Sequence, residues 1–407
     1  MNLKLFINRA VISLDALLSR LIKPKKSVKD RGKKIVLIVF QQLFGDAVIV
    51  QSSLGAYLKA FPENENYRII LLARPSVCSF MKDVLEIPAG ISIEPIDFNR
   101  FLQDYRFYRQ VRRKYRGTAD IIIVPGTSLT AEIFSTMSGA VRRVGLLRYR
   151  DVQSPFIMAL FNRIAYTERV RPDKDDMMLQ HHRILLNYLG VDEYKAKLPS
   201  VLYQENIIQE EQYCVMCPGA SKMEKCWPPE RFALIADYIV EKYGINIHLC
   251  GGNDELGFEK MILSMVKYPQ NIVSHIGKTS FINWSAIVQH ADLVVGNDSA
   301  TMHLAVASRR KAICIVGVYD KYQFFPYKVD QLSDGDILPA SIVKDMPCER
   351  CRTIGYYAGY GNKMCKKRIN KNHCVLCIDI ITPNDVINEI DRAFSQTHHT
   401  VETIRHL

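Results

Sequence analysis

The chain has 407 residues, of which 48% are hydrophobic and 24% are charged. This length fits two domains of about 200 residues each, and the composition excludes a disordered chain. The formal net charge is +12, but residues 1–34 alone carry ten Lys and Arg against two Asp, or +8 of that total. A nucleic-acid-binding protein would more often spread its positive charge over a folded face, so this distribution argues against that class.

The first predicted element is a helix over residues 3–22 with one apolar stripe. The stripe consists of Leu3, Phe6, Ile7, Val11, Leu14, Leu17, Leu18, Leu21 and Ile22. Arg9, Asp15 and Arg20 interrupt it, which excludes a membrane span and fits a secretory signal poorly. We predict that residues 1–33 form an amphipathic, basic segment on an anionic membrane surface. The alternative is a helix packed on the body of the protein and followed by a solvated linker.

Short β-branched runs then alternate with amphipathic stretches, which predicts βαβ units around a parallel sheet. Strands are expected at 34–40, 68–73, 91–96, 119–124 and 142–147. Helices are expected at 47–61, 76–86, 101–115, 127–138 and 174–190. These elements define a predicted N-terminal Rossmann-like domain over residues 34–200.

The pattern restarts after a polar linker at 195–212. Strands are expected at 213–217, 245–250, 271–274, 292–296 and 311–316, and helices at 229–243, 254–267, 281–290, 299–308 and 384–394. We predict a C-terminal Rossmann-like domain over 201–383 and a final helix and tail over 384–407. Two open α/β domains predict a cleft between them, with ligands at the carboxyl ends of the strands.

Asp46 is the candidate catalytic residue of the first half. It follows the first strand in the run Gln41-Gln42-Leu43-Phe44-Gly45-Asp46, directly before a helix whose N–H groups favour an ionised carboxylate. Such a carboxylate in a cleft can act as general base toward a sugar hydroxyl. The alternative is that Asp46 only caps the helix.

Three strand ends of the second half carry candidate ligand-binding residues. The first strand leads into a loop with Ser221, Lys222 and Lys225, which suits a diphosphate next to a helix N-terminus. The second ends in Cys250-Gly251-Gly252-Asn253-Asp254-Glu255, where an acid can bind a ribose. The third continues into Asp298-Ser299-Ala300-Thr301-Met302-His303, whose first-turn amides and hydroxyls can hold phosphate without a metal. No Gly-x-Gly-x-x-Gly or P-loop motif occurs, which disfavours NAD enzymes and P-loop NTPases.

These segments resemble the family 9 glycosyltransferases, the ADP-heptose:lipopolysaccharide heptosyltransferases. The resemblance rests on Gly45-Asp46-Ala47-Val48, Lys225-x-Trp227-Pro228, Gly251-Gly252-x-Asp254-Glu255 and Asp298-Ser299-x-x-Met302-His303-Leu304-Ala305, in the order of the family. It covers about residues 34–395 and implies an α/β, GT-B fold with two Rossmann-like domains facing across a cleft. It also implies an inverting single displacement that requires no metal.

The resemblance also implies residue roles. Asp46 would deprotonate the acceptor hydroxyl, and Lys225 would contact the donor phosphates. Glu255 would lie near the ribose, and His303 would line or support the donor site. The predicted donor-binding set is Ser221, Lys222, Lys225, Gly251, Glu255, Asp298, Ser299, Ala300, Thr301 and His303. Many family members have Gly at the position of Ala300, so the side chain of Ala300 narrows the space beside the donor phosphate.

Five of the eleven cysteines cluster near the C-terminus, in the loop 348–377. Cys348 and Cys351 form one Cys-x2-Cys pair and Cys374 and Cys377 another, a pattern typical of structural zinc. Disulfides and reduced thiols are the alternatives. The other six cysteines lie mostly in apolar runs and are expected to pack as buried thiols in a reducing cytosol.

The sequence thus predicts a metal-independent, inverting glycosyltransferase that uses a nucleotide sugar, with ADP-heptose as the expected donor. Its acceptor would be a lipid-linked saccharide, and its place the cytoplasmic face of the inner membrane as a peripheral protein. No nucleic acid and no catalytic cofactor are expected. The alternatives are a GT-B nucleotide-sugar epimerase and a non-catalytic protein that binds sugar nucleotides or glycolipids.

Overall fold

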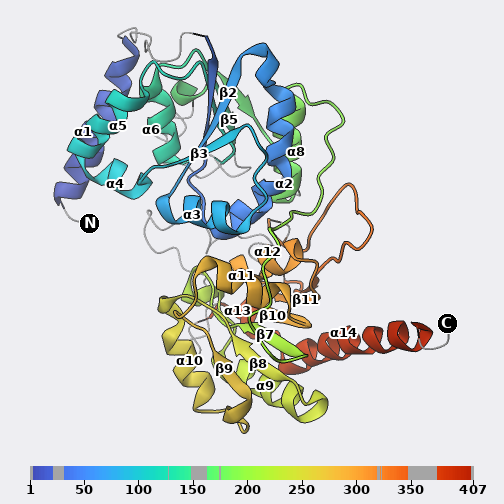
Figure 1. The fold of residues 1–407 in the computed structure, drawn as a ribbon. Coiled ribbons are helices and arrows are strands. Elements are labelled where there is room, and N and C mark those ends of the chain that lie inside the picture. Colours follow the sequence, from blue (N-terminus) through green and yellow to red (C-terminus); the bar gives the residue numbers. More distant parts are fainter. Residues whose placement is uncertain are drawn as a thin grey trace. The chain divides into compact units, whose positions relative to one another are not determined.

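The computed structural model describes residues 3–21, 32–126, 128–147, 163–173, 176–318, 321, 323–346 and 374–404. The chain divides into two compact units, Met1–Lys197 and Leu198–Leu407. Each unit is an α/β body built around its own parallel sheet (Figure 1). The predicted α/β class with two Rossmann-like bodies is therefore confirmed.

The sheet of the first unit has six strands in the order β3-β2-β1-β4-β5-β6, and all neighbouring strands run parallel. The strands are β1 (Lys34–Val39), β2 (Tyr67–Ala73), β3 (Ile91–Pro95), β4 (Ile121–Val124), β5 (Arg142–Leu146) and β6 (Glu168–Val170). Because β1 pairs with both β2 and β4, the order reverses between β1 and β4. That reversal is the topological switch point, where open α/β sheets bind ligands.

Helices cover both faces of this sheet (Figure 1). The helices α2 (Phe44–Ala60), α3 (Pro75–Val84) and α8 (Met178–Tyr188) lie on one side, and α4 (Phe98–Gln103), α5 (Tyr105–Tyr115) and α6 (Leu129–Ser138) on the other. The single helix predicted over 101–115 is wrong, because the chain breaks at Asp104. The Asp104 carboxylate accepts hydrogen bonds from the amides of Arg106 and Phe107, which caps α5 as a separate helix.

The helix α1 (Leu3–Leu18) packs on α4, α5 and α6, followed by the 3-10 turn η1 (Ser19–Leu21). Ile12 and Ala16 are fully buried in the core of the first unit. Asp15 forms an ion pair with Arg112 of α5 at 3.0 Å. The helix is thus part of the folded unit, as the packed-helix alternative predicted.

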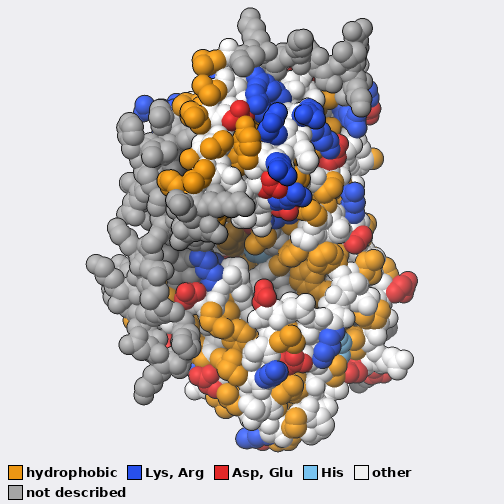
Figure 2. Space-filling model, turned by 90° about the vertical axis from the view of Figure 1, so that its left-hand side faces the viewer, with side chains coloured by type: hydrophobic (Ala, Val, Ile, Leu, Met, Phe, Trp, Pro, Cys, Tyr) orange, Lys and Arg blue, Asp and Glu red, His pale blue; other side chains and the backbone are white. Residues whose placement is uncertain are grey.

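The outer face of α1 remains apolar. The exposed large hydrophobic side chains of α1 and of η1, which continues it, are Phe6, Ile7, Val11, Leu14, Leu18 and Leu21. On the face shown in Figure 2, hydrophobic side chains gather beside a group of Lys and Arg side chains. Among the described helices, none is both long and apolar enough to cross a membrane.

The second unit repeats the same architecture. Its sheet has the order β12-β11-β10-β7-β8-β9, again with parallel neighbours, so the switch point lies between β7 and β10. The strands are β7 (Tyr213–Cys217), β8 (Asn246–Leu249), β9 (Ile272–Ser274), β10 (Leu293–Asn297), β11 (Ala312–Ile315) and β12 (Ala340–Ile342). The strands β6 and β12, of three residues each, were missed by the sequence prediction.

The helices of the second unit are α9 (Pro229–Tyr243), α10 (Leu256–Leu263), α11 (Phe281–Gln289), α12 (Ala300–Ala307), α13 (Leu376–Asp379) and α14 (Pro383–Ile404). The last helix is longer than the predicted 384–394 and packs on α9. Asp391 of α14 accepts hydrogen bonds from the hydroxyls of Tyr238 and Tyr243, each at 2.7 Å, which fixes α14 to the end of α9.

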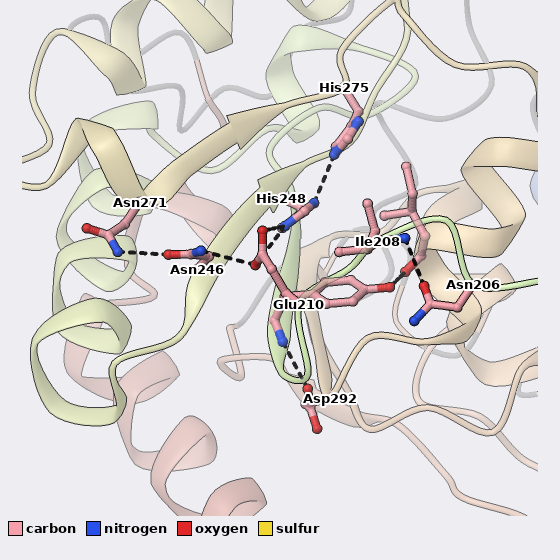
Figure 3. A network of polar contacts seen from close by, with 10 residues as sticks. Asn206, Ile208, Glu210, Asn246, His248, Asn271, His275 and Asp292 are labelled. Atoms are coloured by element: carbon pink, nitrogen blue, oxygen red, sulfur yellow. Dashed lines mark hydrogen bonds and ion pairs between the residues drawn. The ribbon is translucent and has the colours of Figure 1, made fainter.

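A polar network holds the segment before β7 against the edge of this sheet (Figure 3). The Glu210 carboxylate accepts from Nε2 of His248 at 3.3 Å and from the Asn246 amide at 3.1 Å. Nδ1 of His248 lies 2.9 Å from Nε2 of His275. Burial lowers the pKa of both His248 and His275, which favours the neutral rings. A neutral His248 that donates through Nε2 to Glu210 accepts at Nδ1, so His275 donates through Nε2. The end of the predicted linker is therefore anchored to β8 and β9.

Candidate functional site

In the first unit, polar side chains meet at the carboxyl end of the sheet, across the switch point. Gln41, which follows β1, donates a hydrogen bond to the Ser128 hydroxyl before α6. Gln42 donates to the carbonyl of Gly126 at 3.4 Å. Asp46 lies half-buried in the first turn of α2. The N-cap position of α2 is Leu43, so Asp46 is the third residue of the helix and does not occupy the N-cap position itself.

Arg74 lies at the same sheet edge and was missed by the sequence analysis. It directly follows β2, and its Nε donates to the Gln41 carbonyl at 2.8 Å while Nη1 donates to Oδ1 of Asn99 at 3.0 Å. The guanidinium is half-buried, and burial is the main cause that lowers its pKa. A fixed cation at this edge can recognise an anionic group on a substrate. The only sequence signal was its place after a predicted strand.

In the second unit, residues Lys222–Trp227 form the later part of the connection between β7 and α9. This part carries Lys225, and we call it the Lys225 loop. Lys225 ends a 3-10 turn, η5 (Met223–Lys225), and only 7% of its surface is exposed. Lys222 is half-buried, and Ser221, just before the loop, is exposed. Of the three residues predicted on this segment, Lys225 is therefore the most buried.

Asn297 joins the two strand ends at the switch point of the second sheet. Its Nδ2 donates to the carbonyl of Pro218 after β7 at 2.6 Å, and its Oδ1 accepts from the backbone amide of Trp227 at 3.0 Å. Asn297 is fully buried at the end of β10. One side chain thus fixes the Lys225 loop to the strand that leads into Asp298. Sequence analysis passed over Asn297, because its partners are backbone groups distant in sequence.

Glu255 occupies the space beside two glycines at neighbouring strand ends. A Cβ atom at Gly219 would lie 2.0 Å from the Glu255 carboxyl carbon, and one at Gly251 would lie 1.7 Å from Oε2. Glycine at both positions therefore leaves open the space that the Glu255 carboxylate occupies. Burial raises the pKa of Glu255 to about 7, with a smaller contribution from Asp254. The structure thus brings together the predicted residues Gly251 and Glu255.

The third predicted segment begins α12. Ser299 is at the N-cap position but its side chain makes no capping bond to the helix, and Ala300 is the first helical residue. Thr301 in the first turn is 5% exposed. The first amides of a helix have no partner within the helix, which makes this end suited to an anion. The helix follows β10 directly, so these amides lie at the switch point.

His303 is a supporting residue in this geometry. It is 3% exposed, its ring stacks on Phe325 with centroids 4.9 Å apart, and Nδ1 lies 2.7 Å from the Tyr327 hydroxyl. Burial lowers the pKa of His303 to about 3, so the ring is neutral. Its Nε2 lies 3.8 Å from Oδ1 of Asp298. Because the His303 ring is neutral, this contact is not an ion pair.

Two of the four predicted metal ligands are described. Cys374 is fully buried and Cys377, in α13, is 6% exposed. Cys348 and Cys351 lie outside the described residues, as does most of the loop 348–377. Within the described part of the chain, no three His, Cys, Asp or Glu side chains are grouped as metal ligands would be.

The fold is that of a two-unit α/β protein, and in its second unit a buried lysine and a helix N-terminus follow adjacent strands at the switch point. The profile of glycosyltransferase family 9 (heptosyltransferase) matches residues 105–349. This match covers more than half of the chain, so the chain belongs to that family. The predicted family is confirmed.

Individual relatives agree with this assignment. The chain is 24% identical over 218 residues to lipopolysaccharide core heptosyltransferase OpsX of Haemophilus influenzae, across 51% of this chain and 60% of that protein. The chain is thus aligned with less than two thirds of that relative's length.

Solved structures show the same fold. The ADP-heptose lipopolysaccharide heptosyltransferase II of E. coli has a TM-score of 0.63 and 16% identity, across 90% of this chain and 99% of that one. The dodecameric iron-containing heptosyltransferase TibC, in complex with ADP-D-beta-D-heptose, has a TM-score of 0.50 and 14% identity. That alignment covers 90% of this chain and 77% of TibC.

Proposed function

We propose that the protein is an inverting glycosyltransferase that transfers a heptose from ADP-heptose to a lipid-linked saccharide of the lipopolysaccharide type. The observation that carries the proposal is the junction at the second switch point. There Asn297 ties the Lys225 loop to the strand that opens α12, so a buried lysine and a helix N-terminus follow adjacent strands. A departing diphosphate requires a positive charge and hydrogen-bond donors, and the lysine and the amides of the helix N-terminus can provide both. The names of the relatives support a heptose as the sugar.

In the proposed reaction, the Asp46 carboxylate takes the proton from an acceptor hydroxyl. The hydroxyl oxygen forms a bond to the anomeric carbon from the face opposite the diphosphate, and the bond from that carbon to the diphosphate breaks with its electron pair. Lys225 and the first-turn amides of α12 stabilise the charge on the ADP that leaves. Each step uses side-chain or backbone groups of this chain, and the sugar configuration inverts.

A panel of nucleotide sugars tests this function. We expect ADP-heptose and ADP to raise the melting temperature most, because a ligand at 100 times its Kd adds about 2.7 kcal/mol of stability. Incubation with ADP-heptose and a truncated glycolipid should then release ADP and yield the extended glycolipid, measured by mass spectrometry. Stabilisation by UDP-sugars with epimerised product would instead identify an epimerase. Binding without turnover would identify a non-catalytic protein.

We also propose that Cys348, Cys351, Cys374 and Cys377 hold one structural metal ion, because four thiolates suit tetrahedral zinc or iron. The buried positions of Cys374 and Cys377 support this proposal, and TibC is described as iron-containing. Metal analysis of the purified chain for both elements tests it, and a fully active metal-free preparation would refute it.

The outer face of α1 supports a peripheral membrane position. Beside its six exposed apolar side chains lies α5, on which Arg106, Arg109, Arg113 and Lys114 are exposed. An apolar stripe flanked by cations fits an anionic leaflet. We propose the cytoplasmic face of the inner membrane. None of the eight described cysteines forms a disulfide, which agrees with a reducing compartment.

Leu14→Asp should release the protein from anionic vesicles. Leu14 is 58% exposed, and losing the burial of one Leu side chain in the membrane costs about 1.5–3 kcal/mol, or at least tenfold in binding. Leu234→Asp on α9, where Leu234 is 54% exposed, is the matched control. Co-sedimentation with phosphatidylglycerol-containing vesicles measures the effect, and equal binding of both variants and the unaltered chain would contradict it. Deleting α1 is a poorer test, because Ile12 and Ala16 belong to the core.

A further inference from the structure

The segment Cys374–Ile381, which follows the cysteine-rich loop, packs directly on the Lys225 loop. The amide of Val375 donates to the carbonyl of Glu224 at 3.2 Å, next to Lys225. Nε1 of Trp227 donates to the carbonyl of Ile381 at 2.8 Å. Trp227 is fully buried, so this bond fixes its ring without competition from water.

Arg231, in the first turn of α9 directly after the Lys225 loop, also binds the segment Cys374–Ile381. Nη1 donates to the carbonyls of Asp379 at 2.6 Å and Ile381 at 2.9 Å, and Nη2 pairs with Oδ1 of Asp379 at 2.9 Å. The side chains of Arg231 and Asp379 are 20% and 14% exposed, so water screens this ion pair less than one at the surface. The guanidinium also lies over the Trp227 ring, 5.9 Å from a ring centroid.

The Lys225 loop is therefore held from two sides. Asn297 binds the Trp227 amide from the switch point. The segment Cys374–Ile381 binds the Glu224 carbonyl and the Trp227 ring of the loop, and also Arg231 in the first turn of α9. Lys225 lies between these attachments, in a 3-10 turn of three residues. A short turn has little stability of its own, so its geometry depends on the groups that fix its ends.

We infer that the segment Cys374–Ile381 is a latch that positions Lys225 for the donor diphosphate, with Asp379 and Trp227 as positioning residues. The inference rests on the proposed function in that Lys225 is taken as a diphosphate ligand. It assigns to the end of the cysteine-rich region an effect on donor binding beyond stability.

Asp379→Asn tests the latch, because the amide retains an acceptor oxygen and removes only the charge that pairs with Arg231. We expect ADP to bind about tenfold more weakly, measured by calorimetry, since residues that act through others change binding by factors of this order. In hydrogen exchange, the peptide 222–228 should exchange faster, because the amides of Lys225 and Cys226 donate hydrogen bonds within the held loop and the amide of Trp227 donates to Asn297.

Asp391→Asn is the matched control. Asp391 also joins the C-terminal region to α9, through Tyr238, Tyr243 and Lys242, but at the far end of that helix. It should lower the melting temperature without changing ADP affinity or exchange of 222–228. If Asp379→Asn does not fold, Trp227→Phe removes the bond to Ile381 and gives the same readouts.

Unchanged ADP affinity and unchanged exchange in Asp379→Asn and Trp227→Phe would overturn the latch, as would equal effects from Asp391→Asn. The failure of the proposed function would look different. In that case the unaltered chain would not bind ADP at all, while exchange of 222–228 would still decide whether the segment holds the loop.

Discussion

Asp46→Asn is expected to lower turnover by roughly 10²–10⁴-fold while leaving the fold and the affinity for ADP unchanged, the loss typical of a removed general base. Asp46 is half-buried in the first turn of α2, at the switch point of the first sheet. The asparagine keeps the size of the side chain and its hydrogen-bonding oxygen but cannot accept the hydroxyl proton. Single-turnover kinetics with ADP-heptose and a truncated glycolipid measure the loss directly.

Asp104→Asn provides the control for this prediction. Asp104 is also an aspartate at a helix start of the first unit, where it caps α5. Asn is an equally good capping residue, so this variant should retain turnover. A rate close to that of the unaltered chain in Asp46→Asn would remove Asp46 from the chemistry. A similar loss in both variants would point to a general effect on the first unit.

Much of the fold could be predicted because its strands are buried on both faces. The run Lys34–Val39 is almost wholly apolar, as expected for a central parallel strand, and its prediction was close to the observed bounds. The three-residue edge strands β6 and β12 were missed, since so few residues give no periodicity. The break at Asp104 was missed because a continuous helical pattern concealed a capping residue.

The candidate site was predictable where loops follow strands, and less so where side chains bind distant backbone. Glu255 and Lys225 stand out in sequence because an acid and a lysine follow predicted strands. Asn297 acts through the carbonyl of Pro218 and the amide of Trp227, so its own sequence context shows only a turn. The contact of Trp227 with Ile381 spans 154 residues and could be found only in the folded chain.

Lys225→Met should weaken ADP binding by about 1.5–3 kcal/mol, or roughly 10- to 150-fold, because a charge-assisted hydrogen bond to phosphate is lost. The burial of Lys225 makes Met a better test than Ala. With 7% of its surface exposed, Lys225 fills space that Met can occupy and Ala would leave empty. Lys225→Ala should weaken ADP binding at least as much and also lower the melting temperature.

Lys260→Met is the control for charge alone, since Lys260 is an exposed cation of the same unit, on α10. Its loss should leave ADP affinity unchanged at 0.15 M salt, where exposed charges are screened over about 8 Å. Calorimetry of ADP with each variant makes the comparison. If Lys225→Met binds ADP as tightly as the unaltered chain, Lys225 is a buried packing residue, and the diphosphate depends on the first-turn amides of α12. If Lys260→Met weakens binding as much, the effect of Lys225 is the long-range charge of the unit and not a contact.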